Sequence, residues 1–374
     1  MSCSVRCSRC GRPSSNPIRF RCYCGAPLET RIDLVFDKKE IASSDFSLWR
    51  YRRFYPYVAD CDALTLGEGW TPLVRLRNGL RLKLDFLNPT GSFKDRGSAV
   101  LVSAIHRTVK ASGSVIAEDS SGNAGASIAA YAARAGMKSR IFVPSEISGS
   151  KSQQIAWYGA EVVRVEGGRE DVAARAQQYA RGQHYVGHSW HPLFRDGIRS
   201  LAYELCEQLG WRPPHRVYLP ASAGTLLLGV LSGFMHLLES GIIDNVPTVV
   251  ACQPEQVPPL YQRFNEEPVT PSSHVTTIAD ALVTRLPPLL ELMVMNLRAV
   301  NGVVEIVAEN TIYKSYVGLA RKGVFVEPSS AVAYAAYTKQ QEQNLVPEGE
   351  DVVIVLTGSG LKQRPEDVLA RVNP

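Results

Sequence analysis

From residue 66 onward, short apolar runs alternate with longer stretches whose apolar residues recur at helical spacing. A short apolar run bounded by turn residues predicts a buried strand, and strands that alternate with helices predict a parallel α/β sheet. Ligands are then expected at the carboxyl ends of the strands. Six runs have this form and end in a polar turn: VIAEDSSGNAG (115–125), SRIFVPSE (139–146), AEVVRVEGG (160–168), RVYLPASAGT (216–225), TVVACQPE (248–255) and DVVIVLTGSG (351–360).

One long stretch, residues 217–238, contains no Asp, Glu, Lys or Arg. Its length would fit a membrane span, but it also contains Pro220, Gly224 and a Ser-Ala-Gly-Thr turn. A buried strand, a tight turn and a buried helix explain these residues better, so we expect no membrane segment. The first residues lack the apolar run of a signal peptide, and we therefore expect a cytoplasmic protein.

The length of 374 residues exceeds what a single core usually holds and predicts two domains with a small appendage. With 45% hydrophobic and 21% charged residues, the composition is that of a globular protein rather than a disordered one. The net charge of +5 is spread along the chain without a long basic block. It is compatible with an anionic small substrate or with an ordinary solvated surface.

Five of the eight cysteines lie near the start of the chain, and four of them form two closely spaced pairs. Cys7 and Cys10 form a C-x-x-C pair, and Cys22 and Cys24 form a C-x-C pair after residues 11–21. Two such pairs can place four thiolates tetrahedrally around one zinc ion, with Cys3 as a possible substitute ligand. The spacing predicts a structural zinc ribbon over residues 1–33; four reduced thiols, or a ribbon that has lost its metal, are the alternatives.

Glycines directly follow both cysteine pairs, at Gly11 and Gly25, where the chain must turn sharply. A zinc ribbon can also bind nucleic acid, and five arginines between residues 6 and 21 keep that possibility open. No aromatic and basic platform accompanies them, so we do not expect nucleic-acid binding.

The segment NPTGSFKDRGS (88–98) combines a turn with the start of a helix-like run. A lysine at this place beside an apolar ring, Lys94 beside Phe93, could have a lowered pKa and act as a Schiff-base amine. The residue types alone leave open a solvated lysine at a helix start.

Three further turns follow predicted strands. In DSSGNAGAS (119–127), amides before a helix can hold a carboxylate, and an asparagine can reach a phenolic oxygen. In PASAGT (220–225), amides before an apolar helix can cradle a phosphate. An ordinary strand-to-helix connection is the alternative for the second of these turns. The residues concerned are Ser120, Ser121, Gly122 and Asn123 in the first turn, Ser222, Ala223, Gly224 and Thr225 in the second, and Thr357 in the third, LTGSGLK (356–362).

Together and in this order, these segments resemble the fold type II pyridoxal-phosphate-dependent enzymes and, within them, the threonine synthases. The resemblance covers nearly the whole chain. NPTGSFKDRG is similar to the cofactor-lysine motif, and the cysteine ribbon is similar to that of one branch of threonine synthases. The other matching segments are GEGWTPLVRL (67–76), SSGNAG (120–125), GVFVEPSSAVAYAA (323–336) and LTGSGLK.

The resemblance implies a role for each matching residue. Lys94 would hold pyridoxal phosphate as a Schiff base, and Phe93 would pack near the cofactor ring. The turn residues 120–123 would bind the substrate carboxylate, and residues 222–225 would bind the cofactor phosphate. Asn123 would also bond the cofactor's O3′, Thr357 would face the pyridine nitrogen, and Glu327 would lie near the cofactor.

The segment HSWHPLFRDGIRS (188–200) departs from the family pattern. Threonine synthases have Asn and Arg there for the substrate phosphate, where this chain has His191 and Phe194. Arg195 is displaced by one position; we expect it to bind the phosphate with help from Lys151 or Arg199, unless it points outward.

Smaller departures occur in two other segments. The cofactor-phosphate turn is usually Gly-Asn-Gly-Gly-like, where this chain has Ala221-Ser222-Ala223-Gly224-Thr225. The closing motif has Ser359 and Gln363 where His and Asp are common.

The resulting expectation is an α/β protein of fold type II: two three-layer domains with parallel or mixed sheets and a ribbon-like appendage. A large cofactor domain would comprise residues 34–95 and 190–374, and a small mobile domain residues 96–189. The resemblance implies a homodimer that converts O-phospho-L-homoserine and water to L-threonine and phosphate. Alternatives are β-replacement on O-phosphoserine as in cysteate synthase, a serine/threonine dehydratase, and a non-catalytic homologue that binds an amino acid or a protein partner.

Overall fold

The computed structural model describes residues 3–16, 18–58, 62–145, 149–180, 183–270, 277–363, 366 and 368, except for the side chains of residue 3 and residues 149–151. The chain divides into two compact units. The first comprises Met1–Trp70 and Asn88–Ser200, and the second Thr71–Leu87 and Leu201–Pro374. Their bounds differ from those of the predicted domains, because residues 34–70, 88–95 and 190–200 belong to the first unit. Each α/β sheet nevertheless lies inside one predicted domain.

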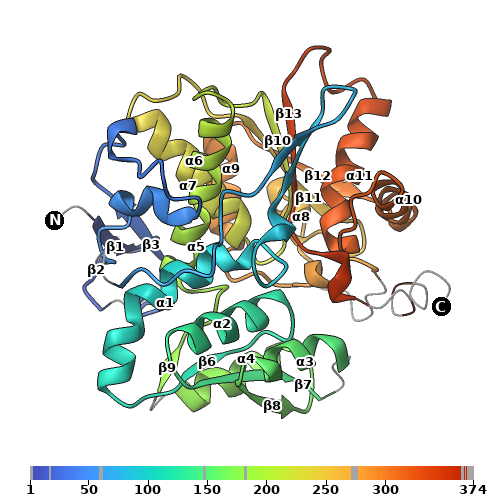
Figure 1. Cartoon of the computed structure of the whole chain (residues 1–374). Coiled ribbons are helices and arrows are strands. Elements are labelled where there is room, and N and C mark those ends of the chain that lie inside the picture. The colour runs from blue at the N-terminus through green and yellow to red at the C-terminus, as the bar shows by residue number, and fades with distance from the viewer. Residues whose placement is uncertain are drawn as a thin grey trace. The chain divides into compact units, whose positions relative to one another are not determined.

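The first unit begins with a three-stranded antiparallel sheet, in the order β2-β1-β3 (Figure 1). Its strands are β1 (Cys3–Cys7), β2 (Pro13–Ser14) and β3 (Leu28–Ile32). Cys7, Cys22, Ala26 and Leu28 form a small buried cluster of their own. The short 3₁₀ helices η1 (Lys38–Glu40) and η2 (Leu48–Phe54) follow.

The rest of the first unit is an α/β layer built on a four-stranded parallel sheet, in the order β8-β7-β6-β9. Helices α2 and α4 both contact β7, and α1 packs along α5. The strands are β6 (Ile116–Glu118), β7 (Ser139–Pro144), β8 (Glu161–Val165) and β9 (His184–Tyr185), and the helices are α1 (Lys94–Ala111), α2 (Asn123–Arg134), α3 (Gly149–Trp157), α4 (Arg169–Tyr179) and α5 (Pro192–Ile198).

Two glycines allow α1 and α5 to approach closely. A Cβ on Gly97 would lie 2.7 Å from the ring of Phe194, and a Cβ on Gly197 would lie 2.2 Å from the carbonyl oxygen of Arg96. Since real Cβ atoms do not come this close to backbone, only glycine fits at the second position. The packing fixes α1, whose first residue is Lys94.

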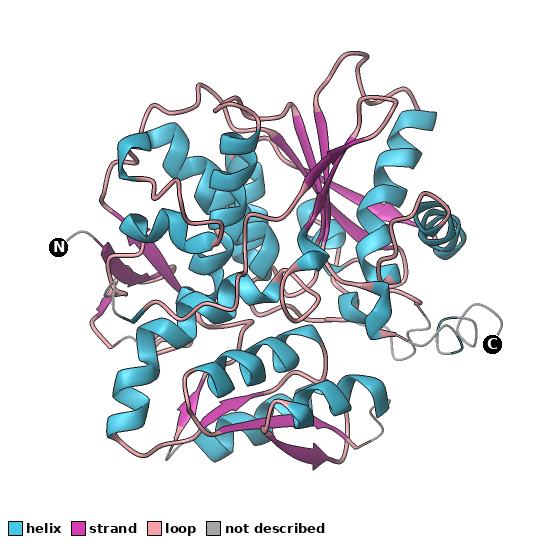
Figure 2. Cartoon of the chain, viewed as in Figure 1, coloured by secondary structure: helices cyan, strands magenta, loops and turns pink. Residues whose placement is uncertain are grey.

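The second unit contains a six-stranded sheet, in the order β12-β11-β10-β13-β5-β4, with helices on both faces (Figure 2). All neighbours are parallel except the edge strand β4, which is antiparallel to β5. The strands are β4 (Leu73–Arg75), β5 (Arg81–Leu84), β10 (Arg216–Pro220), β11 (Thr248–Pro254), β12 (Val303–Val307) and β13 (Val352–Leu356).

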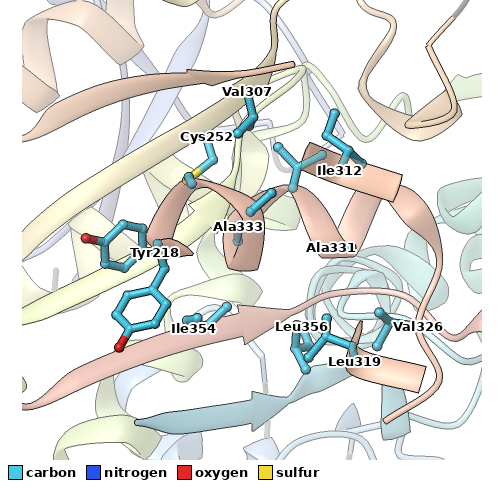
Figure 3. Packing of buried hydrophobic residues seen from close by; sticks show 14 of the residues in the cluster. Tyr218, Cys252, Val307, Ile312, Leu319, Val326, Ala331, Ala333, Ile354 and Leu356 are labelled. Atoms are coloured by element: carbon cyan, nitrogen blue, oxygen red, sulfur yellow. The ribbon is translucent and has the colours of Figure 1, made fainter. Parts of the chain in front are cut away.

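The helices of the second unit are α6 (Ser200–Gln208), α7 (Thr225–Glu239), α8 (Pro259–Phe264), α9 (Leu290–Ala299), α10 (Glu309–Ala320) and α11 (Pro328–Glu342), with the 3₁₀ turns η4 (Asp85–Leu87), η6 (Asp280–Leu282) and η7 (Gly360–Lys362). Helix α11 packs on the sheet and on α10, and its residues Ala331, Ala333, Ala335 and Ala336 are fully buried in the same hydrophobic cluster as Ile354 and Leu356 (Figure 3 labels the first two). Small side chains let the helix approach the strands closely, and Ile354 and Leu356 fill the space between them.

All six strands predicted from the apolar runs are present, as β6, β7, β8, β10, β11 and β13. The charge-free stretch forms strand β10, a turn and the buried helix α7, as predicted. Among the described residues, no helix combines the length and the apolar character needed to cross a membrane.

Candidate functional site

Lys94 is the first residue of α1, and a rigid turn holds it there. The buried carboxylate of Asp95 accepts hydrogen bonds from the amide of Thr90 (2.7 Å), the hydroxyl of Thr90 (2.6 Å) and the hydroxyl of Ser127 (2.6 Å). These bonds tie the turn before α1 to helix α2. The backbone position of the predicted cofactor lysine is therefore fixed from within the first unit.

Two aromatic rings flank the Lys94 side chain. Its Nζ lies 4.7 Å from the ring centre of Phe93 and 5.8 Å from that of Phe194. The neighbouring Ser92 is fully buried, and its hydroxyl has no hydrogen-bond partner among the described residues. A buried polar atom without a partner is rare in proteins, and it is typical of a site that binds a ligand.

The turn between β6 and α2 carries the predicted carboxylate-binding residues. Asn123 is the first residue of α2, and Ser120, Ser121 and Gly122 precede it. A Cβ on Gly125 would lie 1.9 Å from the carbonyl oxygen of Ser120, so glycine alone lets the helix begin this close to the turn. The backbone amides at the N-terminus of α2 thus lie at the carboxyl end of the sheet, where an anion would bind.

Glu118 and His188, which the sequence analysis did not single out, meet at the same edge of this sheet. His188 follows β9, the parallel neighbour of β6, and both side chains are buried. Nδ1 of His188 lies 2.6 Å from Oε1 of Glu118, and the amide of His188 donates to Oε2 (3.0 Å). A carboxylate at the end of an apolar strand was the available signal in the sequence, but only the strand order reveals its partner.

The turn after β10 in the second unit has the features expected of a phosphate cradle. Gly224 has a φ of +94° and caps α7, and a Cβ there would lie 2.7 Å from Sδ of Met293. The amides of Ser222, Ala223 and Gly224 donate to no acceptor among the described residues. Unpaired amides at the start of a 15-residue helix are a suitable anion site. They fit the phosphate of a cofactor.

Thr357 lies at the carboxyl end of β13 in the second unit and is buried. Its amide donates to Oγ of Ser330 (2.7 Å), and its hydroxyl makes no hydrogen bond among the described residues. Glu327 caps α11 nearby, and its amide donates to the carbonyl of Gly358 (2.9 Å). The threonine hydroxyl is thus available to a ligand.

Arg195, predicted to bind a substrate phosphate, makes hydrogen bonds to the protein's own backbone. Its guanidinium donates to the carbonyl of Trp190 (3.1 Å) and to the carbonyl of Leu28 in the N-terminal sheet. Burial lowers the pKa of Arg195 to about 10, against the opposing charge of Glu29, so the side chain remains charged near neutral pH. Because Arg195 anchors the ribbon to α5, the structure gives no support for its predicted contact with the substrate.

Arg199 and Lys151 are the other residues that were predicted to bind the substrate phosphate. Arg199 is buried, and its guanidinium donates to the carbonyl of Phe54 (2.9 Å) and to the carboxylate of Asp196. The side chain of Lys151 lies outside the described residues. The guanidinium of Arg199 is thus engaged by groups of the protein itself.

The four N-terminal cysteines form one cluster, with all sulphur atoms within 4.8 Å of one another. The sulphur atoms of Cys7 and Cys24 are 3.5 Å apart, and those of Cys10 and Cys22 are 3.7 Å apart. Tetrahedral ligands at a Zn–S distance of about 2.3 Å would lie about 3.8 Å apart, so the cluster fits a zinc ion. Gly11 and Gly25 adopt φ values of +68° and +82°, as the turn after each pair requires.

The sequence pattern of the family described as "Pyridoxal-phosphate dependent enzyme" matches residues 64–358. The chain belongs to this family. Threonine synthase of Methanocaldococcus jannaschii is 31% identical over 392 residues, covering 99% of this chain and 95% of that protein. Threonine synthase of Synechocystis sp. is 33% identical, covering 83% of this chain and 82% of that protein.

Solved structures of other members share the fold. Threonine deaminase isoform 2 from Solanum lycopersicum matches with a TM-score of 0.72 at 18% identity, covering 90% of this chain and 88% of that one. The predictions of the family and of its fold are confirmed.

Proposed function

We propose that the protein is a threonine synthase that converts O-phospho-L-homoserine and water to L-threonine and phosphate. The observation that carries this proposal is the likeness to threonine synthases along the whole chain, including the N-terminal ribbon. The rigid turn at Lys94 and the unpaired amides after β10 support it, because a pyridoxal-phosphate enzyme needs a lysine and a phosphate site.

The residues of each unit fit a part of the cofactor. In the first unit, Lys94 would hold pyridoxal phosphate, with Phe93 against the ring and Asn123 at O3′. In the second unit, residues 222–225 would bind the phosphate group, and the hydroxyl of Thr357 would face the pyridine nitrogen. A hydroxyl at that place, unlike a carboxylate, leaves the nitrogen largely neutral.

When bound, pyridoxal phosphate serves as an electron sink for carbanion chemistry on an amino acid. The chain's own residues then place the substrate and move protons. The turn 120–123 would hold the substrate carboxylate through its amides and hydroxyls. The ε-amino group of Lys94 would transfer protons along the substrate chain, which requires that it be neutral for part of the cycle.

The direct test is to incubate the purified, cofactor-loaded protein with O-phospho-L-homoserine and to measure phosphate and threonine together. Equal amounts of both products are expected. Phosphate without threonine, or neither product from a protein that carries bound cofactor, would contradict the proposed reaction.

A second candidate is a related enzyme whose substrate is a different amino acid. The observation that favours it is the engagement of Arg195 and Arg199 with backbone carbonyls, which leaves the segment 188–200 without the expected phosphate-binding arginine. O-phosphoserine with an external nucleophile, and serine or threonine for deamination, are the substrates to test. Release of a 2-oxo acid from threonine, with no product from O-phospho-L-homoserine, would favour this candidate.

We further propose that Cys7, Cys10, Cys22 and Cys24 bind a structural zinc ion, because their sulphur atoms already have the required spacing. Replacing Cys7 and Cys10 by serine should reduce zinc from about one ion per chain to nearly none and lower the unfolding temperature. Elemental analysis measures the metal, and Cys206→Ser, at a buried cysteine outside the cluster, is the control. Unchanged zinc content in the double variant would rule out the site. The homodimer and the cytoplasmic location stay predictions.

A further inference from the structure

Glu118 and His188 form a buried acid–base pair in the same unit as Lys94. The side chains of Glu118 and His188 are 0% and 4% exposed, and 2.6 Å separates their nearest polar atoms. The ring of His188 packs edge-on against Phe194 at 5.7 Å, and Nζ of Lys94 lies 5.8 Å from the same ring. The phenyl group therefore has the lysine amine and the imidazole as neighbours.

Three charged groups of the first unit act on this pair. Lys94 of α1 and Arg169 of α4 stabilise the Glu118 carboxylate and oppose protonation of His188. Asp119, after β6, favours protonation of His188; it accepts a hydrogen bond from the hydroxyl of Tyr185 in β9 (2.7 Å).

Burial dominates the titration of both members of the pair. It raises the pKa of Glu118 to about 8, although the His188 amide and the charges of Lys94 and Arg169 act against the shift. It lowers the pKa of His188, and the charges of Lys94 and Arg169 lower it further. Near neutral pH, the pair therefore favours a form without net charge, in which the carboxyl proton is shared with Nδ1.

We propose that Glu118 and His188 are a positioning pair for Lys94: they hold one exchangeable proton near its amine and so set the pH range in which that amine is neutral. At low pH, the uncharged pair does nothing to retain a proton on Lys94. When the pair releases its proton to solvent, it becomes a buried anion and stabilises the ammonium form. The inference rests on the proposed role of Lys94 as the cofactor lysine, but not on the identity of the substrate.

The second ring nitrogen of His188 can keep a hydrogen bond in both protonation states of the pair. Its Nε2 lies 3.3 Å from the hydroxyl of Ser189, which can accept or donate a hydrogen bond. With the proton on Glu118, Nε2–H donates to Ser189; once the proton is lost, Nδ1–H donates to the carboxylate and Nε2 accepts. Both states keep every hydrogen bond, so the pair can titrate without unfolding the sheet edge.

The first experiment compares the pH dependence of the visible absorption band of the cofactor-loaded protein in wild type and in Glu118→Gln. Glutamine preserves size and hydrogen bonding but cannot become an anion. The proton at the Lys94 nitrogen should then be lost at a pH lower by about one unit, a tenfold change in affinity for that proton.

Glu68→Gln is the matched control for this comparison. Glu68 is equally buried in the same unit and has a pKa raised by burial to about 7, but it accepts hydrogen bonds from Tyr131 and Leu66 rather than from His188. In Glu68→Gln, the pH midpoint of the change in the absorption band should remain that of wild type. An unchanged midpoint in Glu118→Gln, or equal shifts in both variants, would overturn the proposal.

The second experiment needs neither turnover nor bound cofactor. The imidazole ¹⁵N resonances of His188, assigned with His188→Asn, are followed against pH in the cofactor-free full-length protein and in its Lys94→Ala variant. Removing the lysine charge should raise the pH at which the pair loses its proton, because charge coupling is reciprocal. Identical titrations in the two proteins would refute the inference. Absence of the visible band from wild type would instead contradict the cofactor assignment, and the resonances would still test the pair.

Discussion

Each unit of the protein contains a buried ionisable pair, Glu118–His188 in the first and Lys83–Glu204 in the second, and these two pairs are satisfied in different ways. In the second unit, Lys83 and Glu204 are both 0% exposed and form an ion pair. The Lys83 ammonium has three N–H donors, and its other acceptors are the carbonyl of Thr71 (2.7 Å) and the amide oxygen of Gln208 (2.8 Å). Every donor is used within the fold.

The pair in the first unit, Glu118 and His188, is equally buried, but its hydrogen bonds do not fix one protonation state. Among the described residues, Nε2 of His188 is within hydrogen-bond distance of the Ser189 hydroxyl (3.3 Å), and the charge of Lys94 acts on both members of the pair. A pair whose donors are all matched has one stable protonation state and supports the fold. A pair that can gain or lose a proton without losing a hydrogen bond is suited to act on a neighbouring amine.

The largest effect should come from removing that amine. Lys94→Ala is expected to reduce turnover by about 10³-fold or more, since it would remove both the proposed covalent anchor of the cofactor and the proposed proton-transfer group. The free energy of unfolding should change little, because the carboxylate of Asp95 holds the turn before α1 through the amide and hydroxyl of Thr90. Activity assays and urea unfolding on the same preparation measure both; substantial residual turnover would contradict the assignment of Lys94.

Breaking the Lys83–Glu204 ion pair should affect stability rather than turnover. Glu204→Gln leaves a buried ammonium without its counter-charge and should lower the free energy of unfolding by about 3–5 kcal/mol. Turnover per folded molecule should stay within about twofold of wild type. The double replacement Lys83→Met with Glu204→Leu should recover part of the lost stability, because it removes both charges. A loss of activity as large as that of Lys94→Ala would contradict the contrast between the pairs.

The stability of the protein should also depend on pH through the Glu118–His188 pair. The pKa of Glu118 is raised on folding from 4.5 to about 8, so the folded state binds its proton more tightly and stability falls as pH rises through that window. The pKa of His188 is lowered from 6.5, which makes stability rise with pH up to about 6.5 and offsets the glutamate there. The net loss should therefore lie between pH 6.5 and 8 and amount to up to about 2 kcal/mol.

Glu118→Gln should remove most of this decline, and urea unfolding at pH 6.5 and pH 8 measures it. Glu204→Gln keeps the Glu118–His188 pair, so its stability should fall over the same interval as in wild type. If wild type and Glu118→Gln lose equal stability between the two pH values, the carboxyl group of Glu118 does not retain its proton in the folded state.

Much of the fold was predictable, because apolar runs and turn residues are local signals. The six predicted strands, the helix that starts at Lys94 and the amide turns at residues 120–123 and 222–225 are all encoded within a few consecutive residues. The two buried pairs are not local. Glu118 and His188 are 70 residues apart, and Lys83 and Glu204 are 121 apart. Only the strand order and register bring such residues together, and neither follows from the pattern of one strand.

For Arg195, the sequence suggested a contact that the structure does not show. From the sequence, an arginine one position away from the family's phosphate-binding arginine looked like a shifted ligand. In the structure, the residue at the family's position, Phe194, faces Lys94 and His188, and Arg195 points toward β3, 167 residues earlier in the chain. On a helix, a shift of one residue turns a side chain by about 100°, enough to move it from one neighbour to another.

The smallest effect on catalysis is therefore expected for Arg195→Gln. Its loss removes charged hydrogen bonds to Leu28 and Trp190 and should lower the free energy of unfolding by about 2 kcal/mol, mainly by loosening the ribbon from α5. The KM for O-phospho-L-homoserine should remain within about twofold, since the guanidinium is already bound to the carbonyls of Leu28 and Trp190. Arg195→Lys, which keeps the positive charge but loses the forked geometry of the guanidinium, should fall between the two proteins in stability. A tenfold rise in this KM in Arg195→Gln, with the ribbon still holding its metal, would indicate that Arg195 binds the substrate. It would also remove the main reason to consider a substrate other than O-phospho-L-homoserine.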